Sequence, residues 1–216
     1  HSDVMDNGNA SQPAIQHAEQ GGRSLDALLQ DCFGPMSELT LYSARSNTIL
    51  LKTQEGRRIQ DVLKQRGIGF ERWPAHHRPE GNASPAQILE SYKSEIERTQ
   101  ARGHYPSVDA IRVLPDHPDR VSLRRKFLKE HVHAEDEVRF FVEGCGLFCL
   151  HIGDEVVQVL CETDDWISVP AGTPHWFDMG ETPYFCTLRF FNNPNGWVAE
   201  FTGDSIAERY PRLHPS

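Results

Sequence analysis

The sequence has no excess of positive charge, no long apolar run and no C-x-x-C pair. Its 22 lysines and arginines stand against 31 aspartates and glutamates, which gives a net charge of −9. A chain this acidic lacks the basic surface of general nucleic-acid or anionic-membrane binders, so we expect neither partner. Its longest apolar stretches are strand-sized, so no membrane-spanning helix is predicted.

Cysteine is also scarce, and its spacing is uninformative. The five cysteines are odd in number and contain no metal-binding pair, which disfavours a disulfide framework and a zinc ribbon. Four of them fall in strand-like runs and are predicted to be small buried side chains. The polar first residues contain no basic start and no apolar segment, so no secretory signal is expected. A reducing, cytoplasmic location is therefore predicted.

The length of 216 residues favours one domain with an appendage. Residues 1–24 are rich in polar and small residues, which is typical of a flexible arm. One or two short amphipathic turns are predicted at Leu25–Phe33, and Gly34-Pro35 follows as a break. We therefore predict an N-terminal extension over residues 1–35 and a single compact domain over residues 36–216.

Three helices are predicted in the first 130 residues of the chain. Apolar residues recur at helical spacing over 54–66, and Gly67 is well placed to end that helix. Ser84-Pro85-Ala86-Gln87 combines an N-cap serine, a proline at the first helical position and a capping-box glutamine, and Gly103 would stop that helix. A third, basic helix is predicted over 119–129.

The second half of the chain is strand-rich. Short runs of β-branched and aromatic residues alternate with turn signals, which favours a sandwich or small barrel with the helices packed outside. The runs are VRFFV, LFCLHI, VVQVLC, WISVP and CTLRFF, and the turn signals are Glu143-Gly144, Gly153-Asp154, 163–165 and Met179-Gly180. The predicted fold class is mainly β.

One pattern in this half is typical of a metal site. His131 and His133 would face the same side of a strand, and Glu137 and Arg139 share that parity or return to the same cavity after a tight turn. A turn fixed by proline and glycine precedes His175, which would supply a third imidazole from a neighbouring strand.

Three imidazoles and one carboxylate make a borderline nitrogen and oxygen ligand set. An octahedral ion so bound keeps two positions open for a chelating substrate, which favours Fe(II), Ni(II), Co(II) or Mn(II) for catalysis. A four-ligand tetrahedral zinc site would be closed and would suit a structural role. The alternative is that these histidines are ordinary core or surface residues.

The order His-x-His-x₃-Glu-x₆-Gly and then Pro-x-Gly-x₂-His resembles the two cupin motifs at their metal-binding positions. Arg125 and Asp164 stand where those motifs often open with glycine, and the asparagine that commonly follows the second motif is missing. The resemblance implies a cupin fold, a double-stranded β-helix or jelly-roll barrel, with several peripheral α-helices.

The residue pattern is more specific than cupins in general. EHVHAEDEVRFFVEGCG and the later VPAGTPHWFDMG resemble the core of bacterial acireductone dioxygenases, and the flanks MSELTLYS, GIGFERWPA, GWVAEFTGD and YPRL agree. The resemblance covers about 36–213. It implies metal ligation by His131, His133, Glu137 and His175, a role for Arg139 in holding the substrate dianion, and a monomer. Glu130 and Asp136 match positions linked to metal incorporation and conformational coupling.

The family resemblance also implies a reaction. Its members act in methionine salvage, where 1,2-dihydroxy-3-oxo-5-methylthiopentene reacts with O₂. One Fe(II) per chain implies 4-methylthio-2-oxobutanoate and formate as products, and one Ni(II) implies methylthiopropionate, formate and carbon monoxide. Co(II) and Mn(II) are alternative ions that the same ligands would accept.

The thioether tail of such a substrate needs an apolar wall. Phe127, Phe177 and Trp197 are the candidates, because each flanks a motif and aromatic rings contact sulfur well. Each is equally compatible with the barrel core.

Two other functions stay open. Another mononuclear cupin, such as a thiol or flavonol dioxygenase or a sugar isomerase, would share the metal ligands. The Glu137-Val138-Arg139 run and the GWVAEFTGD tail favour the acireductone family over these. A non-catalytic cupin that binds a small ligand or regulates transcription would leave the four-ligand set unexplained, and no helix-turn-helix accompanies it.

Overall fold

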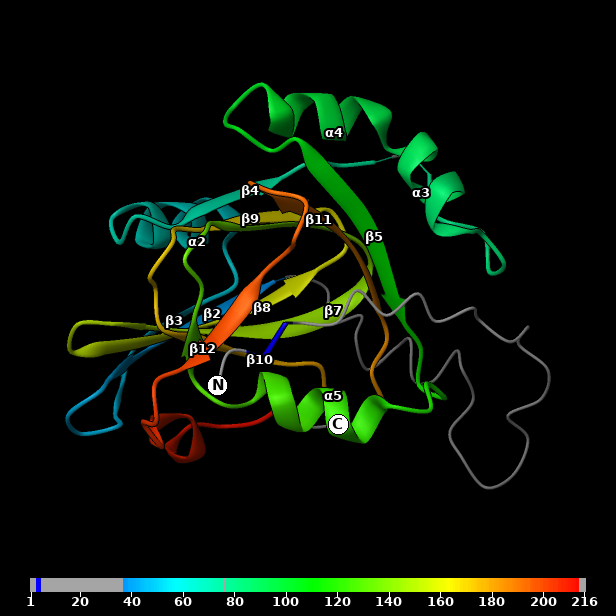
Figure 1. Cartoon of the computed structure of the whole chain (residues 1–216). Coiled ribbons are helices and arrows are strands. Elements are labelled where there is room, and N and C mark those ends of the chain that lie inside the picture. The colour runs from blue at the N-terminus through cyan, green and yellow to red at the C-terminus, as the bar shows by residue number, and fades with distance from the viewer. Residues whose placement is uncertain (1–2, 5–36, 76, 214–216) are drawn as a thin grey trace.

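The structure is a computed structural model that describes residues 3–4, 37–75 and 77–213 (Figure 1). Its strands are β1 (Asp3–Val4), β2 (Glu38–Ser43), β3 (Ile49–Thr53), β4 (Gly69–Arg72), β5 (Ser107–Val113), β6 (His131–Val132), β7 (Glu137–Ile152), β8 (Glu155–Glu162), β9 (Asp165–Val169), β10 (His175–Asp178), β11 (Phe185–Phe191) and β12 (Val198–Phe201). Its helices are α2 (Gly56–Lys64), α3 (Pro85–Ser91), α4 (Lys93–Gln100), α5 (Arg120–Phe127) and the short 3-10 helix η1 (Ile206–Arg209).

Two antiparallel sheets share the long strand β7. One sheet has the order β1-β12-β6-β10-β7-β8-β2-β3. The other runs β4-β9-β7-β11-β5. The first half of β7 pairs with β9 and β11, and its second half pairs with β8 and β10. β7 therefore passes from one sheet to the other and closes that side of the barrel.

Gly144 is the corner at which β7 changes sheets. The sequence predicts a turn at Glu143-Gly144, and that prediction is wrong, because the strand continues through both residues. Gly144 has a φ of +70°, and a Cβ built there would lie 1.8 Å from the backbone oxygen of Tyr184. The partner β11 shifts register between Cys186 and Thr187 at this point. Glycine at this position bends the strand instead of ending it.

The main core lies between the two sheets. It gathers side chains from β2, β7, β8, β9, β10 and β11 together with three from α2, and Phe141, Phe148 and Phe185 are fully or almost fully buried in it. The four cysteines predicted to be small core residues, Cys145, Cys149, Cys161 and Cys186, are all buried thiols. Their prediction is confirmed.

The predicted helices form on the outside of the sheets (Figure 1). α2 packs beside β4, and Gly67 follows it with a φ of +78°. The capping box at Ser84 is present, with both of its hydrogen bonds to Gln87. The single helix predicted up to Gly103 is instead two, α3 and α4, because the backbone leaves the helical conformation at Tyr92.

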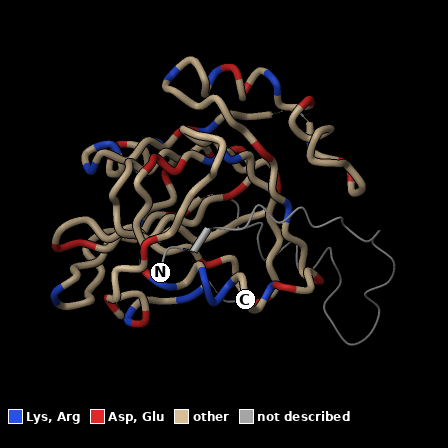
Figure 2. Tube along the Cα trace, in the orientation of Figure 1, with Lys and Arg blue, Asp and Glu red and all other residues tan. Residues whose placement is uncertain are grey.

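α5 carries the predicted basic residues (Figure 2). Val121 on this helix is 62% exposed. Arg124 is not simply a solvated charge, since it donates to both carboxylate oxygens of Asp178 on β10.

Most of the predicted N-terminal extension lies outside the described residues, including the amphipathic turns predicted at Leu25–Phe33. Asp3–Val4 are described, and their backbone pairs antiparallel with Val198 and Ala199 on β12. Within the described part of the chain, no helix has the length and apolar character needed to cross a membrane.

Candidate metal centre

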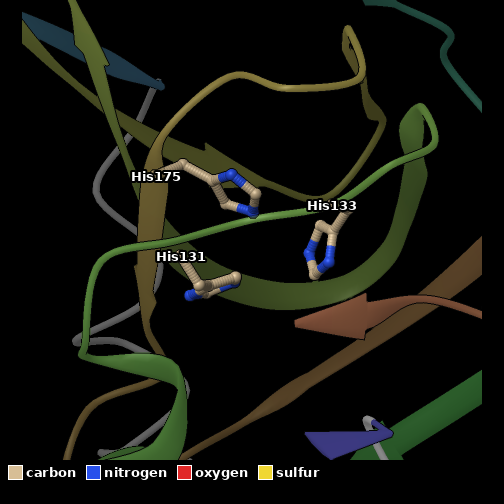
Figure 3. Close-up of side chains that lie close together, drawn as sticks. All are labelled: His131, His133 and His175. Atoms are coloured by element: carbon tan, nitrogen blue, oxygen red, sulfur yellow. The ribbon is translucent and has the colours of Figure 1, made fainter. Parts of the chain in front are cut away.

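Three imidazoles, those of His131, His133 and His175, lie close together (Figure 3). His131 on β6 is paired directly opposite His175, the first residue of β10, so strand pairing alone brings these two rings together. His133 follows β6, and one nitrogen of each ring lies within 4.8 Å of those of the other two. All three side chains are buried.

Each ring is oriented by a backbone carbonyl. Nδ1 of His131 lies 2.7 Å from the oxygen of Lys129, Nδ1 of His175 lies 2.8 Å from that of Thr173, and Nδ1 of His133 lies 3.0 Å from that of Val198. A carbonyl oxygen only accepts, so each Nδ1 carries the proton and donates it. When such a ring is neutral, its Nε2 lone pair is free, and this is the tautomer that a metal requires.

Glu137 supplies the carboxylate. It is the first residue of β7, reached after a tight turn from His133, as the sequence allowed. Its Oε2 lies 2.6 Å from Nε2 of His175 and 3.4 Å from Nε2 of His133. None of these three buried atoms has a hydrogen-bond partner in the described part of the chain. Buried polar atoms without partners are rare, and three of them converging fit a bound cation.

The electrostatics of the cluster also favour a cation. Burial by itself raises the pKa of Glu137, but the charges of His175 and Arg139 outweigh it and hold the pKa well below its ordinary value. Burial, together with the charge of His175, lowers the pKa of His131 to about 3, so this ring is neutral. Burial also lowers the pKa of His133, yet the carboxylate of Glu137 raises it more strongly. A carboxylate that favours positive charge on a neighbouring buried imidazole also favours a cation bound beside it.

Arg139 lies two residues along β7 from Glu137 and is 5% exposed. Its Nε donates to Oε1 of Glu137 at 2.9 Å, and its Nη1 donates to the hydroxyl of Thr187 at 3.3 Å. One oxygen of Glu137 thus holds the guanidinium while the other faces the imidazoles. The predicted juxtaposition of Arg139 with the four ligand candidates is observed.

Two of the three predicted aromatic wall residues contact this group. The guanidinium carbon of Arg139 lies 4.8 Å from the ring centre of Trp197 and 5.6 Å from that of Phe177. Trp197 also stacks on His133 at 6.0 Å. Phe127 is half-buried and packs against the main core, to which Phe177 also belongs.

The two remaining predicted residues brace the ligand-bearing segments. Asp136 accepts a hydrogen bond from the backbone of Ala171, in the loop that leads to His175, and its carbonyl accepts from the indole of Trp197. Glu130 is 4% exposed and accepts from Thr202, while its other oxygen lies 2.9 Å from Nδ1 of His151. Neither residue belongs to the cluster of three imidazoles, and their predicted roles stay predictions.

Two residues close to the centre were not predicted from the sequence. Arg189 on β11 is 5% exposed, lies 5.8 Å from the ring of Trp197 and forms a bidentate ion pair with Asp109 on β5. The sequence did contain a signal for Arg189, which interrupts the apolar run CTLRFF. Arginine is rarely buried in a strand unless it is paired with a carboxylate or another acceptor. β5 itself was not predicted, so its aspartate could not be placed.

A barrel of two antiparallel sheets that carries a buried cluster of three imidazoles and one carboxylate defines a metal-binding cupin. Comparison with known proteins gives the family. Residues 40–199 match the model of the ARD/ARD′ family. The chain belongs to this family, the acireductone dioxygenases, which are metal-dependent dioxygenases.

Individual relatives agree with that assignment. An acireductone dioxygenase of Synechococcus sp. (strain WH7803) is 62% identical over 178 residues, covering 82% of this chain and 99% of the relative. The one from Prochlorococcus marinus (strain MIT 9313) is 63% identical over 184 residues, covering 82% and 100%. A solved structure described as acireductone dioxygenase from Bacillus anthracis with a cadmium ion in its active center superimposes with a TM-score of 0.67 at 28% identity, covering 77% of this chain and 98% of that one. The predicted cupin fold is confirmed.

Proposed function

We propose that the chain cleaves 1,2-dihydroxy-3-oxo-5-methylthiopentene with O₂ in methionine salvage. The observation that carries the proposal is the convergence of His131, His133, His175 and Glu137 on one point, with Arg139 bonded to the far side of the same carboxylate. In this proposal the four side chains hold one Fe(II) or Ni(II). The family membership supports the substrate class.

The bound ion would supply Lewis acidity and a template for a chelating enediol. The chain's own residues do the rest. Glu137 and the three neutral imidazoles fix the position of the ion, and Arg139 presents an always-charged guanidinium to one enediolate oxygen. Phe177 and Trp197 exclude water from that side and offer apolar surface to the thioether.

The first test is a comparison of products. Apoprotein is divided, loaded separately with Fe(II) and Ni(II), and supplied with the acireductone and O₂. We expect 4-methylthio-2-oxobutanoate and formate from the iron form, and methylthiopropionate, formate and carbon monoxide from the nickel form. Identical products from both forms would contradict the role of the metal, and no consumption with either would contradict the substrate.

The second test addresses Arg139. Arg139→Met is expected to retain the metal and to lower kcat/KM by about 100- to 1,000-fold, because a buried positive charge facing the developing anion is lost. Arg139→Lys keeps the charge but loses the planar fork that joins Glu137 to Thr187, so it should recover only part of the activity. Steady-state kinetics with metal content measured on the same samples checks both variants. Full turnover by Arg139→Met would remove Arg139 from the mechanism.

The monomeric state and the cytoplasmic location stay predictions.

A further inference from the structure

A row of three charged residues crosses the second sheet beside the metal centre. Arg139 on β7 lies directly opposite Arg189 on β11, and Arg189 lies directly opposite Asp109 on β5. Directly opposite residues of antiparallel strands project from the same face. Like charges directly opposite each other destabilise a sheet. The facing pair of arginines is therefore unfavourable for stability, which is typical of a functional position.

The two guanidinium groups are held in place. Both arginines are 5% exposed, and their guanidinium carbons lie 4.8 Å and 5.8 Å from the ring centre of Trp197. Arg139 is bonded to Glu137 at 2.9 Å, and Arg189 to Asp109 at 2.8 and 2.6 Å. Each guanidinium group is bonded to its own carboxylate, and these bonds hold the two arginine side chains in position.

In the metal-loaded centre, the guanidinium groups of Arg139 and Arg189 balance the carboxylates of Glu137 and Asp109. Imidazoles that bind an ion through Nε2 are neutral and add no charge. The divalent ion therefore contributes two uncompensated positive charges in a region of low dielectric constant. A ligand with two negative charges restores neutrality, whereas a singly charged ligand does not.

We propose that Arg189, anchored by Asp109, is a positioning residue that sets the positive potential of the centre and so selects doubly charged ligands. The inference rests on the proposed function, which requires an enediolate dianion. It adds Arg189 to the residues of the centre and adds a preference for ligands with two negative charges. Arg189 acts through its neighbours: its charge faces Arg139 from the adjacent strand, and its guanidinium packs near Trp197.

The test uses the Ni(II)-loaded protein and two small chelators of different charge, oxalate with two negative charges and glycolate with one. A change in potential alters the binding free energy in proportion to ligand charge. Arg189→Met is therefore expected to weaken oxalate binding by about 10-fold and glycolate binding by about 3-fold, measured by calorimetry at constant ionic strength. Asp109→Asn removes the compensating negative charge and is expected to tighten oxalate binding, by about 3-fold because Asp109 is partly solvated.

Two controls separate charge from shape. Arg189→Lys keeps the charge and should bind oxalate within about 2-fold of the parent chain. Arg112 and Glu143 form a similar bidentate pair from β5 to β7, with carboxylate distances of 2.8 and 2.7 Å, but they lie outside the row. Glu143→Gln should leave the affinity for both chelators unchanged. Nickel content and Tm are recorded for each variant to establish that it is folded and loaded.

Three results would overturn the inference: equal losses for oxalate and glycolate in Arg189→Met, weaker oxalate binding in Asp109→Asn, or an Arg189→Lys variant as poor as Arg189→Met. If Arg189→Met does not fold, Asp109→Asn and Arg189→Lys decide the question. Chelator binding needs no turnover, so the outcome is independent of the product test. Charge-dependent binding without acireductone cleavage would reject the proposed function and keep this inference, and cleavage without charge dependence would do the reverse.

Discussion

Glu137→Gln is expected to empty the metal centre and abolish oxygen consumption. The amide keeps the shape of the side chain but removes its negative charge, and one of its two oxygen positions becomes an NH₂ group that cannot bind a cation. Loss of a partner that merely orients a ligand costs about 10- to 100-fold in metal affinity or activity. Loss of the charged ligand itself should therefore exceed about 100-fold in both, measured by metal analysis after dialysis and by an oxygen electrode.

A matched control lies on the same strand. Glu143 also pairs with a buried arginine through both carboxylate oxygens, so Glu143→Gln makes the same chemical change away from the imidazoles. It should retain the metal. His175→Gln provides a second variant that leaves the ion pair between Glu137 and Arg139 intact. Normal metal content in both Glu137→Gln and His175→Gln would show that the ion is held elsewhere.

Gly144→Ala is expected to destabilise the fold severely, although it adds only one methyl group. Its φ of +70° is strained for any side chain, and the new Cβ would lie 1.8 Å from the oxygen of Tyr184 and 2.8 Å from the Cα of Phe185. Those neighbours are backbone atoms of the strand region paired with β7, so they cannot rotate away. Strain and overpacking together are expected to lower the free energy of unfolding by about 4 kcal/mol.

Gly153→Ala is the matched control for backbone conformation. Gly153 has a φ of +59°, but no atom lies within 4 Å of the position a Cβ would take. It should cost only about 1 kcal/mol. Urea denaturation of the metal-loaded proteins measures both values, and the difference between the variants reports the close contact alone. Equal costs would mean that the corner of β7 has room to relax.

The grouping of the four candidate ligands could be predicted because their spacing has a local cause. His131 and His133 alternate along one short segment, and the order of the two motifs fixed Glu137 and His175 as their partners. The pairing of His131 with His175 on neighbouring strands then brings the two imidazoles together, as the sequence pattern predicts. The capping box at Ser84 was equally local and formed as predicted.

The features that could not be predicted are non-local. Glu143-Gly144 has turn chemistry, yet the pairing of β7 with a strand on each side carries the chain through the bend. Arg189 and Asp109 are separated by 80 positions along the chain and meet only because β5 and β11 are neighbours. No periodicity within either segment contains that information. In both cases the pairing of strands that are distant in the sequence determines the structure, and local propensity does not.

The carbonyl contacts of the three imidazoles have a consequence for how metal preference can evolve in this chain. Each ring takes its orientation from a main-chain oxygen, a group that every amino acid provides whatever its side chain. Point substitutions at Lys129, Thr173 or Val198 therefore leave the orienting acceptor in place. A shift in selectivity between ions is expected to come instead from altered loop lengths or strand register, which are rarer events than single replacements.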